Sequence, residues 1–280
     1  MIKMRKKGRA ITDLDAIKKA EIEILDETVR VCEKHHLKYF LAYGTLLGAV
    51  RHKGFIPWDD DIDILMPRKD YEKLLKIWNN SGRYRLVECK LDHNYIYPFA
   101  KVVDNDTIMQ EYNVLVEYDM GLYVDIFPYD EVRESGKKNS KFIRKCELLE
   151  KLRMYSMFPY EKILNQDAKK NFGRKTIWKA LRKIGPARIS RLQDKVSRKY
   201  CGKHTDYMGC LCTRYSEREI LPKRIFGDAI EIEFEGKRYK APANYDYMLT
   251  KLYGDYMQLP PEDERVLKHN FKVWEVEKKG

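Results

Sequence analysis

The chain has no long hydrophobic run. Its longest apolar stretch, residues 39–50, is short and interrupted by glycine, whereas a helix that crosses a bilayer needs roughly 20 apolar residues. No transmembrane helix is therefore expected. A signal peptide is not expected either, because the basic residues 1–7 lead to Asp13 and Asp15 instead of an apolar segment. These absences predict a cytoplasmic protein.

Cysteines are few. The six cysteines are spread over 280 residues and form no recognisable disulfide framework. Side chains that suit zinc occur at Cys201, His204, Cys210 and Cys212. Their spacing fits no common zinc finger. Ordinary reduced cysteines are the favoured interpretation, and a zinc site is the alternative.

Acidic residues are scarce relative to basic ones, with 43 Asp and Glu against 55 Lys and Arg and a net charge of +12. The excess gathers in residues 133–199, where apolar residues such as Phe142, Cys146 and Leu149 recur at helical steps. This basic helical region could hold an anionic glycan or dock on lipid headgroups at the inner face of the membrane. A surface that only keeps the protein soluble is the alternative. No nucleic-acid-binding motif is present, so nucleic acid is not an expected partner.

Four acids are packed into residues 58–65, Trp-Asp-Asp-Asp-Ile-Asp-Ile-Leu. Alternation along a strand would place Asp61 and Asp63 on one face and the two isoleucines in a core. Two ionised carboxylates this close repel each other unless a cation lies between them, and carboxylate oxygens suit Mg²⁺ or Mn²⁺. The segment therefore predicts a metal site, with Asp59 nearby. A solvated acidic loop is the alternative, and the interleaved isoleucines disfavour it.

Two other segments also contain candidate site residues. Residues 38–51 predict a short aromatic strand that ends at Gly44 and turns into a helix. Gly44 would let the backbone approach a ligand, while the Thr45 hydroxyl and the free N–H groups of the helix could hold a phosphate. Further along, Asp125 lies between two β-branched residues in a predicted strand, and Pro128 is expected to end that strand.

The succession of strand, Gly-Thr, helix, loop and Asp-hydrophobic-Asp resembles the signature of the nucleotidyltransferase fold. More narrowly, residues 41–64 are similar to the core motif of the LicD family, and the similarity continues at residues 99–104, 121–128, 252–257 and 259–261. The resemblance implies an α/β (α+β) protein with a mixed β-sheet core flanked by helices, to which the basic helical region is added. The nucleotidyltransferase fold usually has a third carboxylate on a neighbouring strand, and Asp125 is the candidate.

We divide the chain into a catalytic core over residues 1–132, a basic helical insertion over 133–200 and a C-terminal part over 201–280 that completes the core. The other expected elements are a helix from Thr12 or Asp13 to about His35, a helix after Pro67, strands at 83–89 and 97–103, a hairpin at 229–240 and a helix from about Asn244 to Gly254. Residues 253–255 match the family's C-terminal motif, and we expect them to end this helix and close the core.

The resemblance also implies an activity. LicD relatives typically move phosphocholine from CDP-choline to a sugar of a cell-surface glycan, such as teichoic acid, lipopolysaccharide or capsule, and release CMP. Relatives in animals act with CDP-ribitol, so the resemblance favours CDP-choline without fixing the CDP-activated alcohol. One alternative is a nucleotidyltransferase that releases pyrophosphate. Another is a non-catalytic module that binds glycan or lipid, which the complete set of acids disfavours.

This activity assigns a role to each candidate residue. One or two divalent ions on the donor's phosphates would be held by Asp59, Asp61, Asp63 and Asp125. Asp125 would also orient or deprotonate the acceptor hydroxyl, or serve as a metal ligand alone. The phosphates of the donor would be contacted by Gly44, Thr45, Arg51, His52 and Lys101. Arg51, His52 and Lys101 each have a purely structural role as the alternative.

Overall fold

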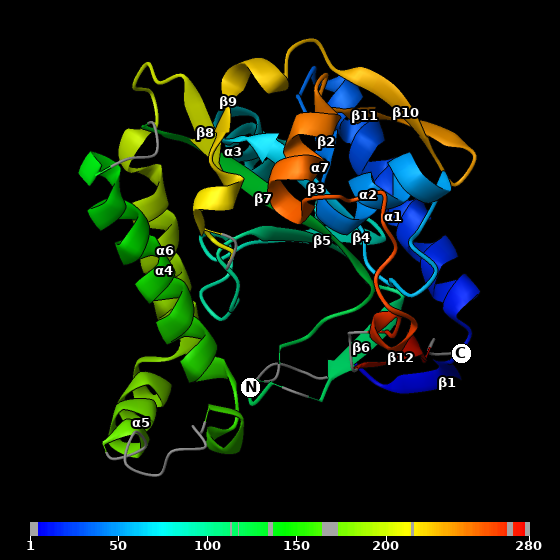
Figure 1. Cartoon of the computed structure of the whole chain (residues 1–280). Helices are drawn as coiled ribbons and strands as arrows, with labels where there is room; N and C mark the ends of the chain where they lie inside the picture. The colour runs from blue at the N-terminus through cyan, green and yellow to red at the C-terminus, as the bar shows by residue number, and fades with distance from the viewer. Residues whose placement is uncertain are drawn as a thin grey trace.

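A mixed β-sheet occupies the centre of the computed structural model, which describes residues 5–112, 114–116, 118–133, 137–163, 173–213, 216–267 and 271–277. The main strand order is β2-β3-β7-β5-β4, and β8 and β9 extend the sheet beside β7. The strands are β2 (Phe40–Leu41), β3 (Asp63–Pro67), β4 (Tyr84–Val87), β5 (Ala100–Asp104), β7 (Tyr123–Val132), β8 (Tyr207–Gly209) and β9 (Leu221–Pro222). β3 and β7 run parallel, and the remaining described pairs in this sheet run antiparallel. The predicted α+β class is confirmed (Figure 1).

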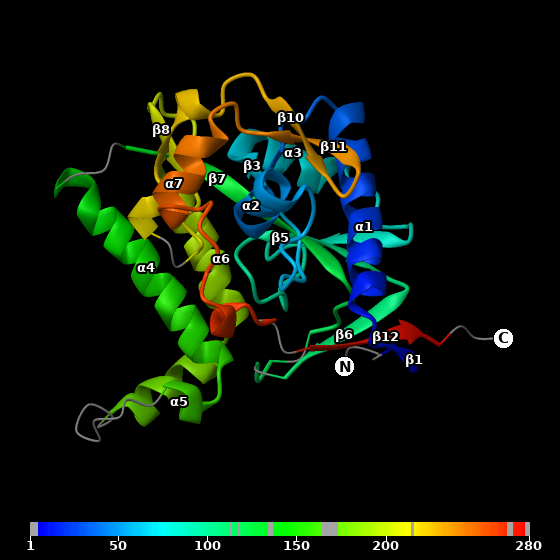
Figure 2. The ribbon, with the colours of Figure 1, turned by 45° about the vertical axis from the view of Figure 1, so that its right-hand side comes forward.

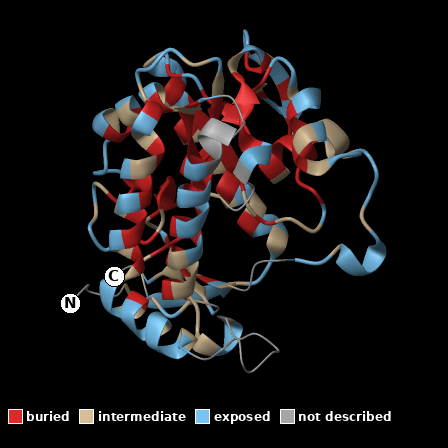
Figure 3. Ribbon diagram, turned by 60° about the vertical axis from the view of Figure 1, so that its left-hand side comes forward, coloured by how far each residue is buried: buried red, intermediate tan, exposed pale blue. Residues whose placement is uncertain are grey.

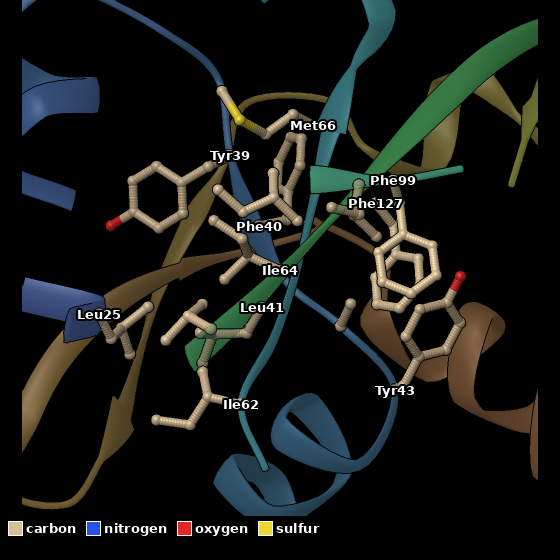
Figure 4. Close-up of a cluster of buried hydrophobic side chains, with 14 of the residues drawn as sticks. Leu25, Tyr39, Phe40, Leu41, Tyr43, Ile62, Ile64, Met66, Phe99 and Phe127 are labelled. Atoms are coloured by element: carbon tan, nitrogen blue, oxygen red, sulfur yellow. The ribbon is translucent and has the colours of Figure 1, made fainter. Parts of the chain in front are cut away.

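The acidic segment enters this sheet later than predicted. β3 begins at Asp63, so Asp61 lies in the loop before the strand. Ile62 and Ile64 are nevertheless fully buried, as the alternation predicted. Figure 4 shows both isoleucines packed near Leu41, where β2 and β3 meet.

The prediction that Pro128 ends its strand was wrong. β7 continues to Val132, and Pro128 lies opposite Met66 in the parallel pair with β3. On the other flank of β7, β5 pairs only as far as Ile126 and β8 begins to pair at Asp130. Pro128 falls between these two partners, where a missing N–H group interrupts no ladder on that flank.

Three helices pack on the sheet, namely α1 (Leu14–Lys34), α2 (Tyr43–His52) and α3 (Arg68–Ile77). The Asp13 side chain caps α1 by accepting a hydrogen bond from the Asp15 N–H. Buried residues on one face of α1 recur at helical spacing, which confirms the predicted amphipathic helix. α2 begins at Tyr43, one residue before the predicted end of the strand. Figure 3 shows the buried residues concentrated around the sheet.

The basic region is helical where the structure describes it. It comprises α4 (Lys137–Met157), η1 (Tyr160–Ile163), α5 (Arg174–Ile184), α6 (Pro186–Ser197) and η3 (Arg198–Tyr200). α4 and α6 lie side by side, and α5 lies across one end of them (Figures 1 and 2). Two small hydrophobic clusters, separate from the main core, join these helices. Two lysines of the basic region, Lys169 and Lys170, lie outside the described residues.

A buried ion cluster ties this region to the sheet. The Arg68 guanidinium, at the start of α3, donates to Asp130 of β7 at 2.7 Å and to Asp194 of α6 at 2.8 Å. All three side chains are buried. Removing one partner would leave an uncompensated buried charge, so the cluster fixes α6 against the sheet.

The C-terminal part confirms two predicted elements. β10 (Ile230–Phe234) and β11 (Lys237–Ala241) form the predicted hairpin, whose two turn residues, Glu235 and Gly236, have φ of 51° and 72°. α7 (Tyr245–Tyr253) is capped by the Asn244 side chain and ends at Gly254, with φ of 75°. Single turns of 3₁₀ helix are η4 (Ser216–Glu219), η5 (Lys223–Ile225) and η6 (Glu262–Glu264).

A second sheet was not predicted. It contains β1 (Lys7–Ile11), β12 (Phe271–Val276) and β6 (Thr107–Glu111), in the order β1-β12-β6, and so joins the two ends of the chain (Figure 2). Within the described ranges, no helix is both long and apolar enough to span a membrane. The three-part division at residues 132 and 200 stays a prediction.

Candidate active site

A cavity of about 940 Å³ opens beside one face of the sheet. It is lined by the ends of β3, β5 and β7, the start of α2, the segment that follows α7, and parts of α4 and β6. The predicted site residues on its wall are Gly44, Arg51, Asp59, Asp61, Asp63, Lys101 and Asp125. Thr45 and His52 do not line it.

Three charged residues form a row across neighbouring strands. Asp63 of β3 lies directly opposite Asp125 of β7, and Asp125 lies directly opposite Lys101 of β5. The Lys101 ammonium, which is buried, forms an ion pair with the Asp125 carboxylate. Adjacent strands are about 4.8 Å apart, so strand register alone brings these side chains together. The predicted third carboxylate therefore lies beside the acidic segment.

The acidic loop lies next to this row. Carboxylate oxygens of Asp59, Asp60 and Asp61 all lie within 4.8 Å of one another, and among the described residues this is the group of three or more potential ligands that could hold a metal ion. Sequence reasoning did not include Asp60, which is buried and not on the cavity wall. Hard oxygen ligands of this kind fit Mg²⁺ or Mn²⁺.

The electrostatics of the site are those of crowded carboxylates. Burial raises the pKa of Asp63 well above its usual value, and the nearby carboxylates of Asp61, Asp125 and Asp59 raise it further, while Lys101 opposes the rise. A divalent cation among these groups would offset both effects, because it favours the ionised form. These carboxylates suit the predicted ion in kind and in charge. Within the described residues, the group whose ligand atoms all lie within 4.8 Å of one another is Asp59, Asp60 and Asp61, and it does not include Asp63 or Asp125.

Glu21 is an acidic residue that sequence reasoning missed. It lies on the buried face of α1, is 1% exposed, and its Oε2 atom has no hydrogen-bond partner among the described residues. Burial raises its pKa well above the usual value, and the carboxylates of Asp61 and Asp60 add to the rise. The charge of Glu21 is therefore coupled to the charges of the acidic loop. A Glu at an otherwise apolar position of the helix was the available signal.

Gly44 and Thr45 position the acids. A Cβ atom on Gly44 would lie 2.5 Å from Asp59 Oδ2, so the glycine leaves room for that carboxylate. The buried Thr45 hydroxyl accepts a hydrogen bond from the Asp63 N–H at 2.8 Å. Thr45 thus lies behind the cavity wall and holds the start of β3, while Gly44 lies on the wall.

Arg51 and His52 lie at the end of α2. The Arg51 guanidinium donates to the Tyr256 carbonyl oxygen at 2.9 Å and to His52 Nε2 at 2.9 Å. The His52 ring packs edge-on against Trp58. These contacts give both residues a structural part, and only Arg51 also faces the cavity.

The wall includes residues that sequence reasoning left out. Tyr253 and Asp255, expected only to close the core, line the cavity. Tyr43 lines it too, and has a left-handed backbone conformation with φ of 44°. The Tyr43 hydroxyl donates to Glu219, which is fully buried. Burial raises the pKa of Glu219 to about 8. A left-handed backbone conformation in a non-glycine residue such as Tyr43 is common at functional sites.

The zinc alternative is not supported. All six cysteines are free thiols. The Cys201 thiol donates to Asp130 at 3.2 Å, while the sulfurs of Cys210 and Cys212 lie 3.2 Å apart in the core. In the part of the chain that the structure describes, these residues and His204 do not form a metal-binding group.

The chain is similar to known proteins across this region. The family model of the LicD/FKTN/FKRP nucleotidyltransferase domain matches residues 36–178, which include every predicted site residue. The chain is 34% identical to the lipopolysaccharide cholinephosphotransferase LicD of Haemophilus influenzae over 256 residues, 89% of this chain and 92% of that protein.

Two uncharacterized Rickettsia proteins match shorter parts of the chain. The Rickettsia typhi protein is 38% identical over 27% of this chain and 23% of its own length. The Rickettsia prowazekii protein is 44% identical over 20% of this chain and 21% of its own length. The long match and the family model decide the assignment. The chain belongs to the LicD family of phosphotransferases.

Proposed function

We propose that this protein transfers phosphocholine from CDP-choline to a sugar of a lipopolysaccharide or a related cell-surface glycan and releases CMP. One observation carries the proposal. The row of Asp63, Asp125 and Lys101 lies beside the acidic loop on one cavity wall, in a chain similar over 89% of its length to a lipopolysaccharide cholinephosphotransferase.

The proposed chemistry depends on charge and position. The diphosphate of the donor is doubly negative, so attack on it requires neutralisation and in-line alignment more than covalent help. Asp59, Asp61, Asp63 and Asp125 would hold Mg²⁺ or Mn²⁺, which when bound neutralises phosphate charge and acts as a Lewis acid. Lys101, already paired with Asp125, would contact a phosphate oxygen.

The acceptor supplies the nucleophile. Its sugar hydroxyl attacks the phosphorus that bears choline, a new P–O bond forms, and the P–O bond to CMP breaks. The hydroxyl proton passes to Asp125 or to solvent, and Asp125 orients the hydroxyl from the centre of the row. The products are the phosphocholine diester of the glycan and CMP.

A nucleotidyltransferase that releases pyrophosphate is the second candidate, favoured by the description of the matching family domain. A donor panel separates the two. Purified protein is incubated with Mg²⁺, a lipopolysaccharide acceptor and CDP-choline, CDP-ethanolamine, CDP-glycerol or CDP-ribitol in turn. We expect CMP with CDP-choline above all. Faster CMP release with another donor would replace choline, and pyrophosphate release from CTP would replace the proposed reaction.

The acceptor is proposed to meet the protein at its basic helices. α5 has exposed Lys175, Lys179 and Lys183, and its apolar side chains Ile177 and Ile184 are 55% and 47% exposed. A basic amphipathic helix with exposed apolar residues suits an anionic membrane surface. We therefore propose peripheral contact with the inner face of the membrane, where a glycolipid acceptor would lie.

A further inference from the structure

Aromatic rings surround a positive charge on the cavity wall. The Lys101 Nζ atom lies 3.3 Å from the centroid of the Tyr123 ring, 4.9 Å from that of Tyr97 and 5.4 Å from that of Phe99. All three rings line the cavity. Ring faces attract cations through their quadrupole, within about 6 Å of the centroid. This part of the wall is therefore built to accept a cation.

The rings are close to the reacting groups. Tyr123 and Asp125 are two residues apart on β7, and Phe99 and Lys101 are two residues apart in and before β5, so each pair shares a face of the sheet. Two residues along a strand span roughly 7 Å. A cation on these rings would thus lie a short chain away from a phosphate held at Asp125.

The charge of the cavity wall also favours a bound cation. Among the described lining residues, seven carboxylates face two cationic side chains, Arg51 and Lys101. One of the carboxylates, Glu111, accepts a hydrogen bond from the Tyr97 hydroxyl at 3.2 Å and so belongs to the aromatic part of the wall. An anionic donor gains from carrying a cation of its own into such a cavity.

We propose that Tyr97, Phe99 and Tyr123, together with Glu111, form the subsite for the quaternary ammonium group of the donor alcohol. This inference rests on the proposed function. A trimethylammonium group has no N–H donors and is best recognised by ring faces, whereas a lysine ammonium is strongly hydrated and gains from hydrogen bonds. When the donor binds, its phosphates offer Lys101 an anionic partner, and the choline takes the ring faces.

Equilibrium binding tests the subsite separately from transfer. CDP-choline is compared with CDP-3,3-dimethylbutanol, a neutral analogue in which carbon replaces the ammonium nitrogen, by calorimetry with Mg²⁺ and without acceptor. We expect the unsubstituted protein to bind CDP-choline at least about tenfold more tightly than the analogue. Tyr97→Leu should remove most of this preference, while Tyr97→Phe, which keeps the ring, should retain it.

A control comes from the other part of the cavity. Tyr256 lines the wall beside Arg51, so Tyr256→Leu should change the affinity for both donors equally. Equal affinity of the unsubstituted protein for the two donors, or an unchanged preference in Tyr97→Leu, would overturn the subsite. Transfer is measured in parallel: CMP release from CDP-choline without the binding preference would leave the proposed function standing and reject the subsite. A binding preference for CDP-choline without CMP release would support the subsite and reject the proposed function.

Discussion

Backbone register, more than side-chain contact, sets the position of the two central carboxylates. The Asp63 N–H donates to the Thr45 hydroxyl, and the Asp63 carbonyl oxygen accepts from the Ala42 N–H at 3.0 Å. The Asp125 N–H donates to the Ile62 carbonyl oxygen at 2.9 Å. Because these bonds use backbone atoms of the two aspartates, a change of either side chain should leave the strands in place.

Replacing a carboxylate should therefore separate activity from stability. Asp61→Asn and Asp63→Asn should each lower the rate of transfer on the order of 100-fold or more, because a ligand for the proposed ion is lost. Their melting temperature without metal should hold or rise, since one repelling charge is gone. Initial rates and melting curves with and without Mg²⁺ check this. Substantial transfer by either variant would remove that residue from the site.

Glu219 predicts a pH dependence of stability. In the unfolded chain its carboxyl group has a pKa near 4.5, and in the folded protein burial raises the pKa to about 8. Between these values the folded state binds more protons than the unfolded state, so the free energy of unfolding falls as the pH rises, by up to about 1.4 kcal/mol per pH unit. Below pH 4.5 both states are protonated and this contribution is constant.

The comparison variant is Glu219→Gln, which has no titrating group at that position. Urea unfolding at pH 5, 6, 7 and 8 should show the unsubstituted protein losing stability relative to the variant as the pH rises. A difference between the two proteins that does not change over this range would show that Glu219 ionises normally in the folded state.

The local pattern of the sequence was sufficient to predict Asp61, Asp63 and Asp125, because alternation with buried residues is visible within a few positions. It gave no signal for Glu219, and for Glu21 only the presence of a Glu at an otherwise apolar position of α1. Glu21 is buried near the acidic loop, and Glu219 is buried next to Tyr43. These interactions join α1 and η4 to segments far away in the sequence.

Helix α2 and the acidic loop form one packed unit. Gly44 leaves room for Asp59, and a Cβ atom on Gly48 would lie 2.4 Å from the Gly54 carbonyl oxygen. The unit continues into β3 through the Thr45 hydroxyl. The position of the acidic loop therefore depends on two glycines of α2, Gly44 and Gly48.

Gly44→Ala tests this dependence. Alanine favours a helix by up to about 1 kcal/mol over glycine, so the fold should remain stable. The added methyl group would displace the Asp59 carboxylate, and transfer should fall on the order of 10- to 100-fold with weaker Mg²⁺ binding. Gly82→Ala is the control, because no atom lies within 4 Å of its added Cβ. Equal activity of the two variants would show that Asp59 can move at no cost.

Helix α5 tests the proposed contact with the acceptor. Exchanging Lys175, Lys179 and Lys183 for glutamine should raise the apparent KM for lipopolysaccharide on the order of 10- to 100-fold and weaken its dependence on salt, while donor affinity stays constant. Binding to anionic vesicles should weaken in parallel.

The matched control removes three exposed lysines from α1 and α3, Lys19, Lys69 and Lys76. An equal loss in the two triple variants would assign the effect to net charge. An equal loss of donor and acceptor affinity in the α5 variant would place these lysines at the donor site, and no change would leave α5 as ordinary surface.

Helices and turns whose boundaries are marked by local residues could be predicted from the sequence. Asp13 at α1, Glu235-Gly236 in the hairpin and Gly254 after α7 each mark a boundary by local chemistry. β1 and β12 were missed because each is stabilised by pairing with the other, from opposite ends of the chain. β1 is also largely exposed and shows no alternation of buried residues.

The protein combines a positive overall charge with an acidic cavity. A net charge of +12 suits approach to an anionic glycolipid surface, whereas the excess of carboxylates among the described wall residues requires cations before an anionic donor can bind. The proposed divalent ion and the proposed choline subsite both meet that requirement.

The most direct test of this account is the phosphorus chemistry itself. ³¹P NMR follows a reaction of the protein with CDP-choline, Mg²⁺ and lipopolysaccharide, with Asp63→Asn as the inactive reference. We expect the diphosphate signals to disappear while CMP and a glycan phosphodiester appear in equal amounts, only in the presence of the divalent ion and only with the unsubstituted protein. Persistence of the diphosphate signals with every acceptor and CDP-alcohol tested, or equal turnover by Asp63→Asn, would contradict it.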